Sequence, residues 1–271
     1  HAERVAICEG GRTHTYRELE SAVESLVARM QAASVLPSSI VAVFLPRSFD
    51  LLVALHATWR MRAIYLPLDS SLPELMACAM LASARPNLII TRAEHALSPA
   101  LRCAPALLLD ASGDEGEVPS ASAPRAQHPD AAYLLFTSGS SGRRKGVLGS
   151  LRGLENRLQA SAREWREPEP PVLLHNAQSG FDISLWELLF PLLLGGRVVM
   201  LAAGTQPDMD TFVAAIEREH VNVVHFIPSM FSLFIEHPRV ASLAGLRLIV
   251  CGGESLSPRH CRAYVASGLR A

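Results

Sequence analysis

The stretch Tyr133-Leu-Leu-Phe-Thr-Ser-Gly-Ser-Ser-Gly-Arg-Arg-Lys-Gly-Val147 joins an apolar segment to a loop of glycine and hydroxyl residues that ends in cations. The glycines permit backbone angles that other residues resist, and successive backbone N–H groups in such a loop form a concavity that binds anions. Lys145 can place a positive charge beside a phosphate group. The stretch therefore predicts a loop that binds a polyphosphate.

Two other interpretations of this loop are weaker. A flexible Ser/Gly linker is disfavoured because the flanks, residues 132–136 and 147–148, have the apolar pattern of buried strands. A P-loop of the NTPase type requires four residues between its glycines and then Gly-Lys-Ser/Thr. Here two residues separate Gly139 from Gly142, and Gly146 follows the lysine. The loop is therefore expected to bind phosphate in another way.

Composition limits the classes of function. The 271 residues suggest one large or two modest domains, and the formal net charge of -1 favours neither nucleic acid nor an acidic membrane as a partner. The five cysteines are scattered without a Cys-x-x-Cys pair, which argues against a disulfide framework and a zinc site. No apolar run approaches the ~20 residues that span a bilayer, and no signal peptide is evident. We expect a cytoplasmic protein without a metal site built from its own side chains.

Apolar runs alternate with helical patterns along the chain. The expected strands are 40–45, 63–68, 87–91, 106–109, 132–136, 172–174, 197–201, 221–226 and 246–250. The expected helices are 15–30, 48–59, 73–83, 151–164, 183–194, 208–220, 229–236 and 258–266. This alternation predicts an α/β fold with two mostly parallel sheets and flanking helices. The polar segment 111–130 is expected to join two subdomains, residues 1–128 and residues 129–271, of which the second carries the loop.

Asp182 is an acid at the expected start of a helix. Helix capping is the usual role of aspartate at such a position. Its neighbours Phe181, Ile183 and Trp186 are apolar, however, and a carboxylate in apolar surroundings needs a partner. The ammonium group of a ligand would serve as that partner.

Residues 252–255, Gly-Gly-Glu-Ser, directly follow an expected strand. A tight turn accounts for the glycines, and close approach of the backbone to a planar ligand is the functional alternative. Ligands gather beyond the carboxyl ends of parallel strands. Because Phe136, Phe226 and Val250 all stand at such ends, we expect the two glycine-containing loops to open onto one crevice.

Together these motifs resemble the adenylate-forming superfamily, whose phosphate loop usually reads Thr-Ser-Gly-Ser/Thr-Thr-Gly-x-Pro-Lys-Gly. Ser141 stands for the usual threonine and keeps the hydroxyl, whereas Arg144 stands for the usual proline, which loosens the loop and adds charge. Phe-Asp-x-Ser followed by Trp is similar to the core motif of amino-acid adenylation domains of nonribosomal peptide synthetases. In that family the aspartate holds the substrate α-ammonium, and acyl-CoA synthetases and luciferase-type relatives usually lack it.

The resemblance implies a role for each matching residue. The ATP phosphates would lie against Thr137, Ser138, Gly139, Ser140, Ser141 and Gly142, with Lys145 as the catalytic residue beside the leaving pyrophosphate. The adenine side of the nucleotide site would contain Gly253, Glu254 and Ser255. The amino-acid pocket would be lined by Asp182, Ile183, Trp186, His225, Val250 and Gly252. Trp186 narrows this pocket and His225 adds a polar wall, which favours a small polar substrate such as serine.

The implied reaction joins an amino acid and ATP, with Mg²⁺, to give an aminoacyl-adenylate and pyrophosphate. The partners would be a carrier protein with a phosphopantetheine thiol and neighbouring synthetase domains. The family's segments that supply a magnesium-binding glutamate, a ribose-binding aspartate and a C-terminal lysine do not occur in this sequence. We therefore expect the N-terminal core of such an enzyme, incompetent alone. The alternatives are an aryl or fatty acid activator, which would leave Asp182 unpaired, and a non-catalytic interaction module.

Overall fold

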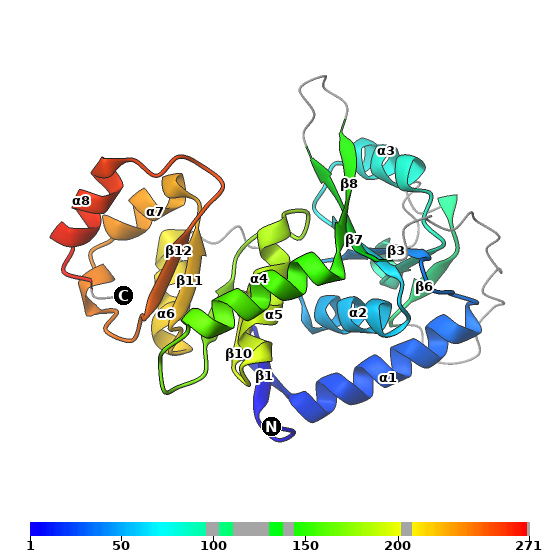
Figure 1. Cartoon of the computed structure of the whole chain (residues 1–271), viewed down its shortest axis with the longest axis horizontal. Coiled ribbons are helices and arrows are strands. Elements are labelled where there is room, and N and C mark those ends of the chain that lie inside the picture. Colours follow the sequence, from blue (N-terminus) through cyan, green and yellow to red (C-terminus); the bar gives the residue numbers. More distant parts are fainter. Residues whose placement is uncertain (96–102, 111–129, 138–143, 202–207, 270–271) are drawn as a thin grey trace. The chain divides into compact units, whose positions relative to one another are not determined.

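The computed structural model describes residues 1–95, 103–110, 130–137, 144–201 and 208–269 (Figure 1). The chain divides into two compact units. Unit 1 consists of His1–Tyr16, Ala160–Ala177 and Ile183–Ala271, and unit 2 consists of Arg17–Gln159 and Gln178–Asp182. Each unit contains a six-stranded sheet flanked by helices. The α/β class and the two sheets expected from the sequence are therefore confirmed.

The sheet of unit 2 is parallel except at one edge. Its strands, in spatial order, are β6 (Ala106–Leu108), β5 (Leu88–Thr91), β3 (Ile40–Leu45), β4 (Ile64–Asp69), β7 (Ala131–Thr137) and β8 (Lys145–Ser150). Only β7 and β8 pair in antiparallel fashion among these strands. The central strand β3 buries every residue from Val41 to Leu45, as expected of a strand covered on both faces.

Helices cover both faces of this sheet. Figure 1 shows α2 (Phe49–Arg60) and α3 (Glu74–Ala84) on opposite sides of β3. The side chain of Ser48 caps α2 by accepting a hydrogen bond from the N–H of Leu51 at 3.3 Å. The unit also contains most of α1 (Tyr16–Ala32), whose buried residues recur at helical spacing.

The sheet of unit 1 has the same plan, with one antiparallel strand at its edge. Its strands, in spatial order, are β12 (Leu248–Cys251), β11 (Val223–Phe226), β9 (Val172–His175), β10 (Arg197–Met200), β1 (Val5–Glu9) and β2 (Arg12–Thr15). Ile7 of β1 pairs with Val198 of β10, so the N-terminal strand joins a sheet made mostly of residues beyond position 171.

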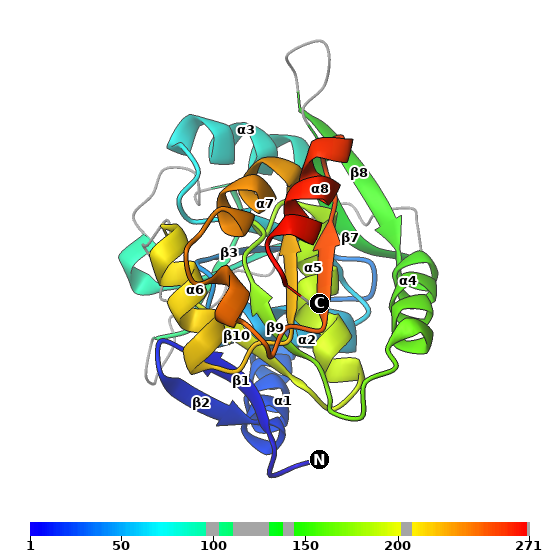
Figure 2. The ribbon, with the colours of Figure 1, turned by 90° about the vertical axis from the view of Figure 1, so that its left-hand side faces the viewer.

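The core of unit 1 is aromatic. Phe226 at the end of β11 packs against Phe212, Phe231 and Phe234, with its ring centroid 4.7 Å from that of Phe234. These partners come from α6 (Met209–Arg218) and α7 (Pro228–Ile235). The other helices that belong to this unit are α5 (Asp182–Leu193), from Ile183 onward, and α8 (Pro258–Ala266), which lies beside α7 (Figure 2).

Three features differ from the sequence-based expectation. The sheet of unit 2 continues through β7 and β8, beyond the boundary predicted at residue 128. The strands β1 and β2 are absent from the prediction, since the strand that holds them in place lies far away in the sequence. The segment 147–148 is a strand, as predicted, but this strand lies at the sheet edge, where Val147 is 49% exposed. Most of the polar segment 111–130 lies outside the described residues.

A glycine beside β10 provides a test of the packing in unit 1. A Cβ atom on Gly196 would lie 1.9 Å from the backbone oxygen of Pro171. We expect Gly196→Ala to lower the free energy of unfolding by about 1–3 kcal/mol, because backbone must move to admit the methyl group. Urea denaturation would measure this loss. Gly245→Ala is the matched control, since its Cβ would meet nothing within 4 Å; equal midpoints for the two variants would contradict the expectation.

Among the described residues, no helix has the length and apolar character required to cross a lipid bilayer.

Candidate functional site

The two ends of the expected phosphate loop lie side by side. Thr137 is the last residue of β7 and Lys145 the first of β8, and the two are paired across the antiparallel ladder. The hydroxyl of Thr137 donates a hydrogen bond of 3.5 Å to the backbone oxygen of Lys145. Both side chains are exposed. The other expected phosphate ligands, Ser138, Gly139, Ser140, Ser141 and Gly142, lie outside the described residues, so the anion-binding role of the loop stays a prediction.

Asp182 begins helix α5, as predicted, but its surroundings are more open than the sequence suggested. Its side chain is 69% exposed, and the neighbouring Phe181 is also exposed. The carboxylate oxygen Oδ2 lies 3.6 Å from Nη1 of Arg157, on α4 (Leu151–Glu164). The apolar neighbourhood expected from the sequence is therefore corrected to an exposed ion pair. Such a pair contributes little stability, so a ligand ammonium could exchange with Arg157 at small cost.

Trp186 lies one turn after the start of α5 and is only 3% exposed. Its ring stacks on Phe190 with centroids 5.1 Å apart, and its Nε1 donates a hydrogen bond of 3.0 Å to the hydroxyl of Ser161. Burial and a satisfied N–H are what a large aromatic side chain needs in a core. Ile183, at the same helix end, is half-buried. The pocket-lining role of both residues stays a prediction.

The carboxyl ends of β11 and β12 bring three of the expected pocket residues together. His225 is the register partner of Val250, and the N–H of Gly252 donates a hydrogen bond of 3.1 Å to the backbone oxygen of Phe226. A Cβ atom on Gly252 would lie 3.7 Å from Nε2 of His225. The imidazole therefore faces the backbone that directly follows β12.

The segment after β12 closes onto the start of α7. Gly253 has a φ of 87°, a conformation that favours glycine. The carboxylate of Glu254 accepts hydrogen bonds of 3.0 Å from the N–H and 3.2 Å from the hydroxyl of Ser229, in the first turn of α7. Negative charge is favourable at a helix N-terminus. Ser255 is exposed. Glu254 thus holds the turn against α7, and contact of this turn with adenine stays a prediction.

Glu187 carries the most buried charge in the described part of the chain, and it is not among the site residues expected from the sequence. Glu187 of α5 is fully buried between the ends of β9 and β11. Its Oε2 lies 2.8 Å from Nδ1 of His175, and its Oε1 lies 3.0 Å from Nδ1 of His225. Oε2 also accepts hydrogen bonds of 2.9 Å from the backbone N–H groups of Asn176 and Ala177. One carboxylate therefore ties together two strand ends and a helix.

Hydrogen bonding decides the charge of this carboxyl group. Burial alone would raise the pKa of Glu187, but the hydrogen bonds from His175 and His225 outweigh it and lower the pKa from 4.5 to about 2. A sequence signal for this residue exists, because Glu187 is the only charged residue in α5 after Asp182. A charge in an otherwise apolar helix needs a buried partner.

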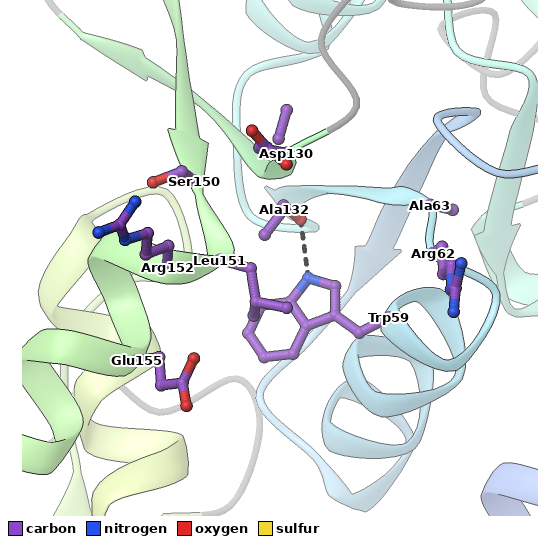
Figure 3. A pocket seen from close by; sticks show the side chains of 10 residues that line it. Trp59, Arg62, Ala63, Asp130, Ala132, Ser150, Leu151, Arg152 and Glu155 are labelled. Carbon is purple, nitrogen blue, oxygen red and sulfur yellow. Dashed lines mark hydrogen bonds between the residues drawn. The ribbon is translucent and has the colours of Figure 1, made fainter.

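A separate hollow of about 540 Å³ lies at the other end of β7 and β8, away from Thr137 and Lys145 (Figure 3). Trp59 forms one side of it and donates a hydrogen bond of 2.7 Å from Nε1 to the backbone oxygen of Ala132. Arg152 and Glu155 of α4 lie on the opposite side. None of the expected site residues lines this hollow, so it is distinct from the candidate site.

No group of three or more histidine, cysteine, aspartate or glutamate side chains is arranged to hold a metal ion within the part of the chain that the structure describes. The carboxylate of Glu187 is already surrounded by hydrogen-bond donors.

Comparison with known proteins identifies relatives along the whole chain. A family model described as AMP-binding enzyme matches residues 1–270. Vanchrobactin synthetase VabF of Vibrio anguillarum is 33% identical over 96% of this chain and 9% of its own length. Enterobactin synthase component F of Escherichia coli is 32% identical over 96% of this chain and 20% of its own length. The chain thus spans a fifth or less of these two curated relatives.

Solved structures agree with this match. The N-terminal subdomain of Klebsiella oxytoca NpsA, in complex with 3-hydroxyanthranilyl-AMSN, has a TM-score of 0.82 and 28% identity over 98% of this chain and 67% of its own. An artificially fused adenylation–PCP di-domain, NpsA-ThdA, has a TM-score of 0.82 and 27% identity over 98% of this chain and 52% of its own. Both sheets described above are therefore those of a known fold.

Proposed function

Because this chain belongs to the AMP-binding enzyme family and matches the N-terminal portion of nonribosomal peptide synthetase adenylation domains, we propose that it activates an α-amino acid with ATP. The product would be an aminoacyl-adenylate, which is then loaded onto the phosphopantetheine thiol of a carrier protein. The observation that carries this proposal is the position of Asp182, an exposed carboxylate at a helix start whose present partner, Arg157, is also exposed. A substrate ammonium can replace that partner.

The proposed chemistry is a displacement at phosphorus. A carboxylate oxygen of the amino acid attacks the α-phosphorus of ATP, and the bond from that phosphorus to the bridging oxygen breaks as pyrophosphate leaves. Lys145, exposed at the start of β8, would neutralise charge on the departing pyrophosphate, with the Thr137 hydroxyl beside it. Mg²⁺ would bind together with the nucleotide, because phosphate oxygens are among the ligands that it prefers.

A small polar substrate fits the side chains proposed to line the pocket. Trp186 is large and held firmly against Phe190, which limits the space near the helix start. His225 offers a ring nitrogen on the side of Gly252. Serine is therefore the proposed substrate. The fused adenylation–PCP di-domain among the relatives supports a carrier protein as the partner.

Activation of an aryl acid is the second candidate. It is favoured by the NpsA subdomain structures, whose ligands carry 3-hydroxybenzoyl and 3-hydroxyanthranilyl groups. Asp182 separates the two candidates. An aryl acid without an amine adjacent to its carboxyl group offers no ammonium to Asp182, whose carboxylate would then stay paired with Arg157.

The test is ATP–pyrophosphate exchange by the full-length protein that contains this chain. The panel would consist of α-amino acids, their des-amino analogues and 3-hydroxybenzoate. We expect serine to support the fastest exchange and its des-amino analogue to support at least tenfold less, since one charge-assisted hydrogen bond is absent. Faster exchange with 3-hydroxybenzoate than with any amino acid would favour the aryl acid activator instead.

A further inference from the structure

The buried carboxylate of Glu187 is surrounded by four hydrogen-bonding groups. Two of them, the backbone N–H groups of Asn176 and Ala177, can only donate, and both point to Oε2 at 2.9 Å. The third, Nδ1 of His175, lies 2.8 Å from the same oxygen. The fourth, Nδ1 of His225, lies 3.0 Å from Oε1 and is the only one of the four on that side. The two oxygens therefore have unequal surroundings.

An ionised carboxylate only accepts hydrogen bonds, so each of the two histidines must direct an N–H toward it. In a neutral ring, this requirement places the proton on Nδ1. In that neutral tautomer the ring nitrogen Nε2 is an acceptor. The oxygen that faces each ring thus selects its tautomer, as a carboxylate partner commonly does for histidine.

The two rings differ in what their Nε2 atoms can reach. Nε2 of His175 is buried and has no hydrogen-bond partner, and its side chain is 0% exposed. The side chain of His225 is 7% exposed, and its Nε2 lies 3.7 Å from the place where a Cβ on Gly252 would stand. Only His225 therefore offers its acceptor to the region of Gly252, which we have proposed as substrate pocket.

We propose that Glu187 is a positioning residue that locks His225 in the Nδ1–H tautomer, so that Nε2 accepts a hydrogen bond from the side chain of the substrate. This inference rests on the proposed function, and it specifies the substrate class as amino acids with a hydrogen-bond donor near the β-carbon. A site that holds a buried acceptor in place discriminates against a ligand that cannot donate to it.

The variant Glu187→Gln tests whether Glu187 sets the tautomer of His225, because the glutamine amide has one acceptor end and one donor end. The carbonyl oxygen must occupy the Oε2 position, where two backbone N–H groups cannot change their role. The NH₂ group then faces Nδ1 of His225. We expect His225 to switch to the Nε2–H tautomer while His175 keeps its own, so the two rings respond differently to one substitution.

Nitrogen-15 NMR of histidine-labelled full-length protein measures the tautomer directly. In the unmodified protein we expect a protonated Nδ1 and a bare Nε2 in His225, and in Glu187→Gln the reverse, with His175 as internal reference. Glu236→Gln, an exposed glutamate after α7, is the control that should change neither ring. A protonated Nε2 on His225 in the unmodified protein would overturn the proposal, and this arm remains decisive even if the variant does not fold.

Substrate selection provides the second readout. Serine can donate or accept through its hydroxyl, whereas O-methylserine can only accept. In ATP–pyrophosphate exchange, we expect the ratio of kcat/KM for O-methylserine to that for serine to rise about fivefold or more in Glu187→Gln, as one neutral hydrogen bond is gained. An unchanged ratio despite a switched tautomer would refute the specificity role. Absence of exchange with every amino acid would instead refute the proposed function, and the NMR result would still decide whether the lock exists.

Discussion

Replacing Asp182 with alanine is expected to lower amino-acid-dependent ATP–pyrophosphate exchange of the full-length protein by roughly 10- to 150-fold, the range that corresponds to one hydrogen bond between charged groups. In the proposed complex the carboxylate receives the α-ammonium of the substrate. Without it the ammonium would face Arg157, whose guanidinium now lies 3.6 Å from the carboxylate. The loss should be smaller than for a fully buried ion pair, because the Asp182 side chain is 69% exposed.

Matched measurements separate this effect from damage to the fold. ATP binding by Asp182→Ala should remain near its original affinity, since Thr137 and Lys145 are unchanged. Asp210→Ala removes another exposed aspartate from the first turn of a helix and should leave exchange intact. If Asp182→Ala retains more than a third of the original exchange rate, the carboxylate does not bind the ammonium group.

Replacing Glu187 with alanine is expected to lower the free energy of unfolding by about 3–5 kcal/mol, the usual cost of removing one partner from a buried charged network. Two histidines and two backbone N–H groups would lose their acceptor, and the methyl group would leave a void. Denaturant unfolding at neutral pH measures this loss. Glu236→Ala, at an exposed position, should change stability by less than about 0.5 kcal/mol.

The lowered pKa of Glu187 determines how the loss of stability in Glu187→Ala depends on pH. In the folded chain the pKa of Glu187 is lowered from 4.5 to about 2, so the folded state favours the ionised form. Its contribution to stability is complete above about pH 5 and is lost as the pH falls toward 2. The difference in unfolding free energy between the original protein and Glu187→Ala should therefore shrink over that interval. A difference that stays constant from pH 7 to pH 3 would mean that packing, not the carboxylate charge, is what the substitution removes.

Local sequence patterns predict the buried elements of this fold well. Residues 40–45 form an unbroken apolar run, and β3 occupies those residues because a strand covered on both faces needs no polar positions. The helices α4 and α8 also begin and end where the pattern predicts. β1 and β2 escape prediction because their place in the sheet depends on β10, far away in the sequence.

The candidate site shows the same contrast between local patterns, which can be predicted, and contacts between distant elements, which cannot. Parallel strands place their carboxyl ends together, which predicted that Phe226 and Val250 lie at one edge of a sheet, and they do end neighbouring parallel strands. The assignment of His225 and Gly252 to the pocket came instead from the resemblance to adenylation domains. The partners Arg157 and His175 could not be assigned, because each contact joins side chains of different elements. A local sequence pattern does not indicate which side chains of two different elements will be in contact. Glu187 left only an indirect sign, a single charge within an apolar helix.

The pairing of β1 with β10 also affects how the chain is made. During synthesis Ile7 leaves the ribosome long before Val198, its register partner. The sheet of unit 2, which is built from residues 40–150, is complete before then. Domains generally fold as units during synthesis. Strand β1 therefore lacks its parallel partner while the sheet of unit 2 forms, and during that interval its apolar side chains and unpaired edge are open to association with other chains.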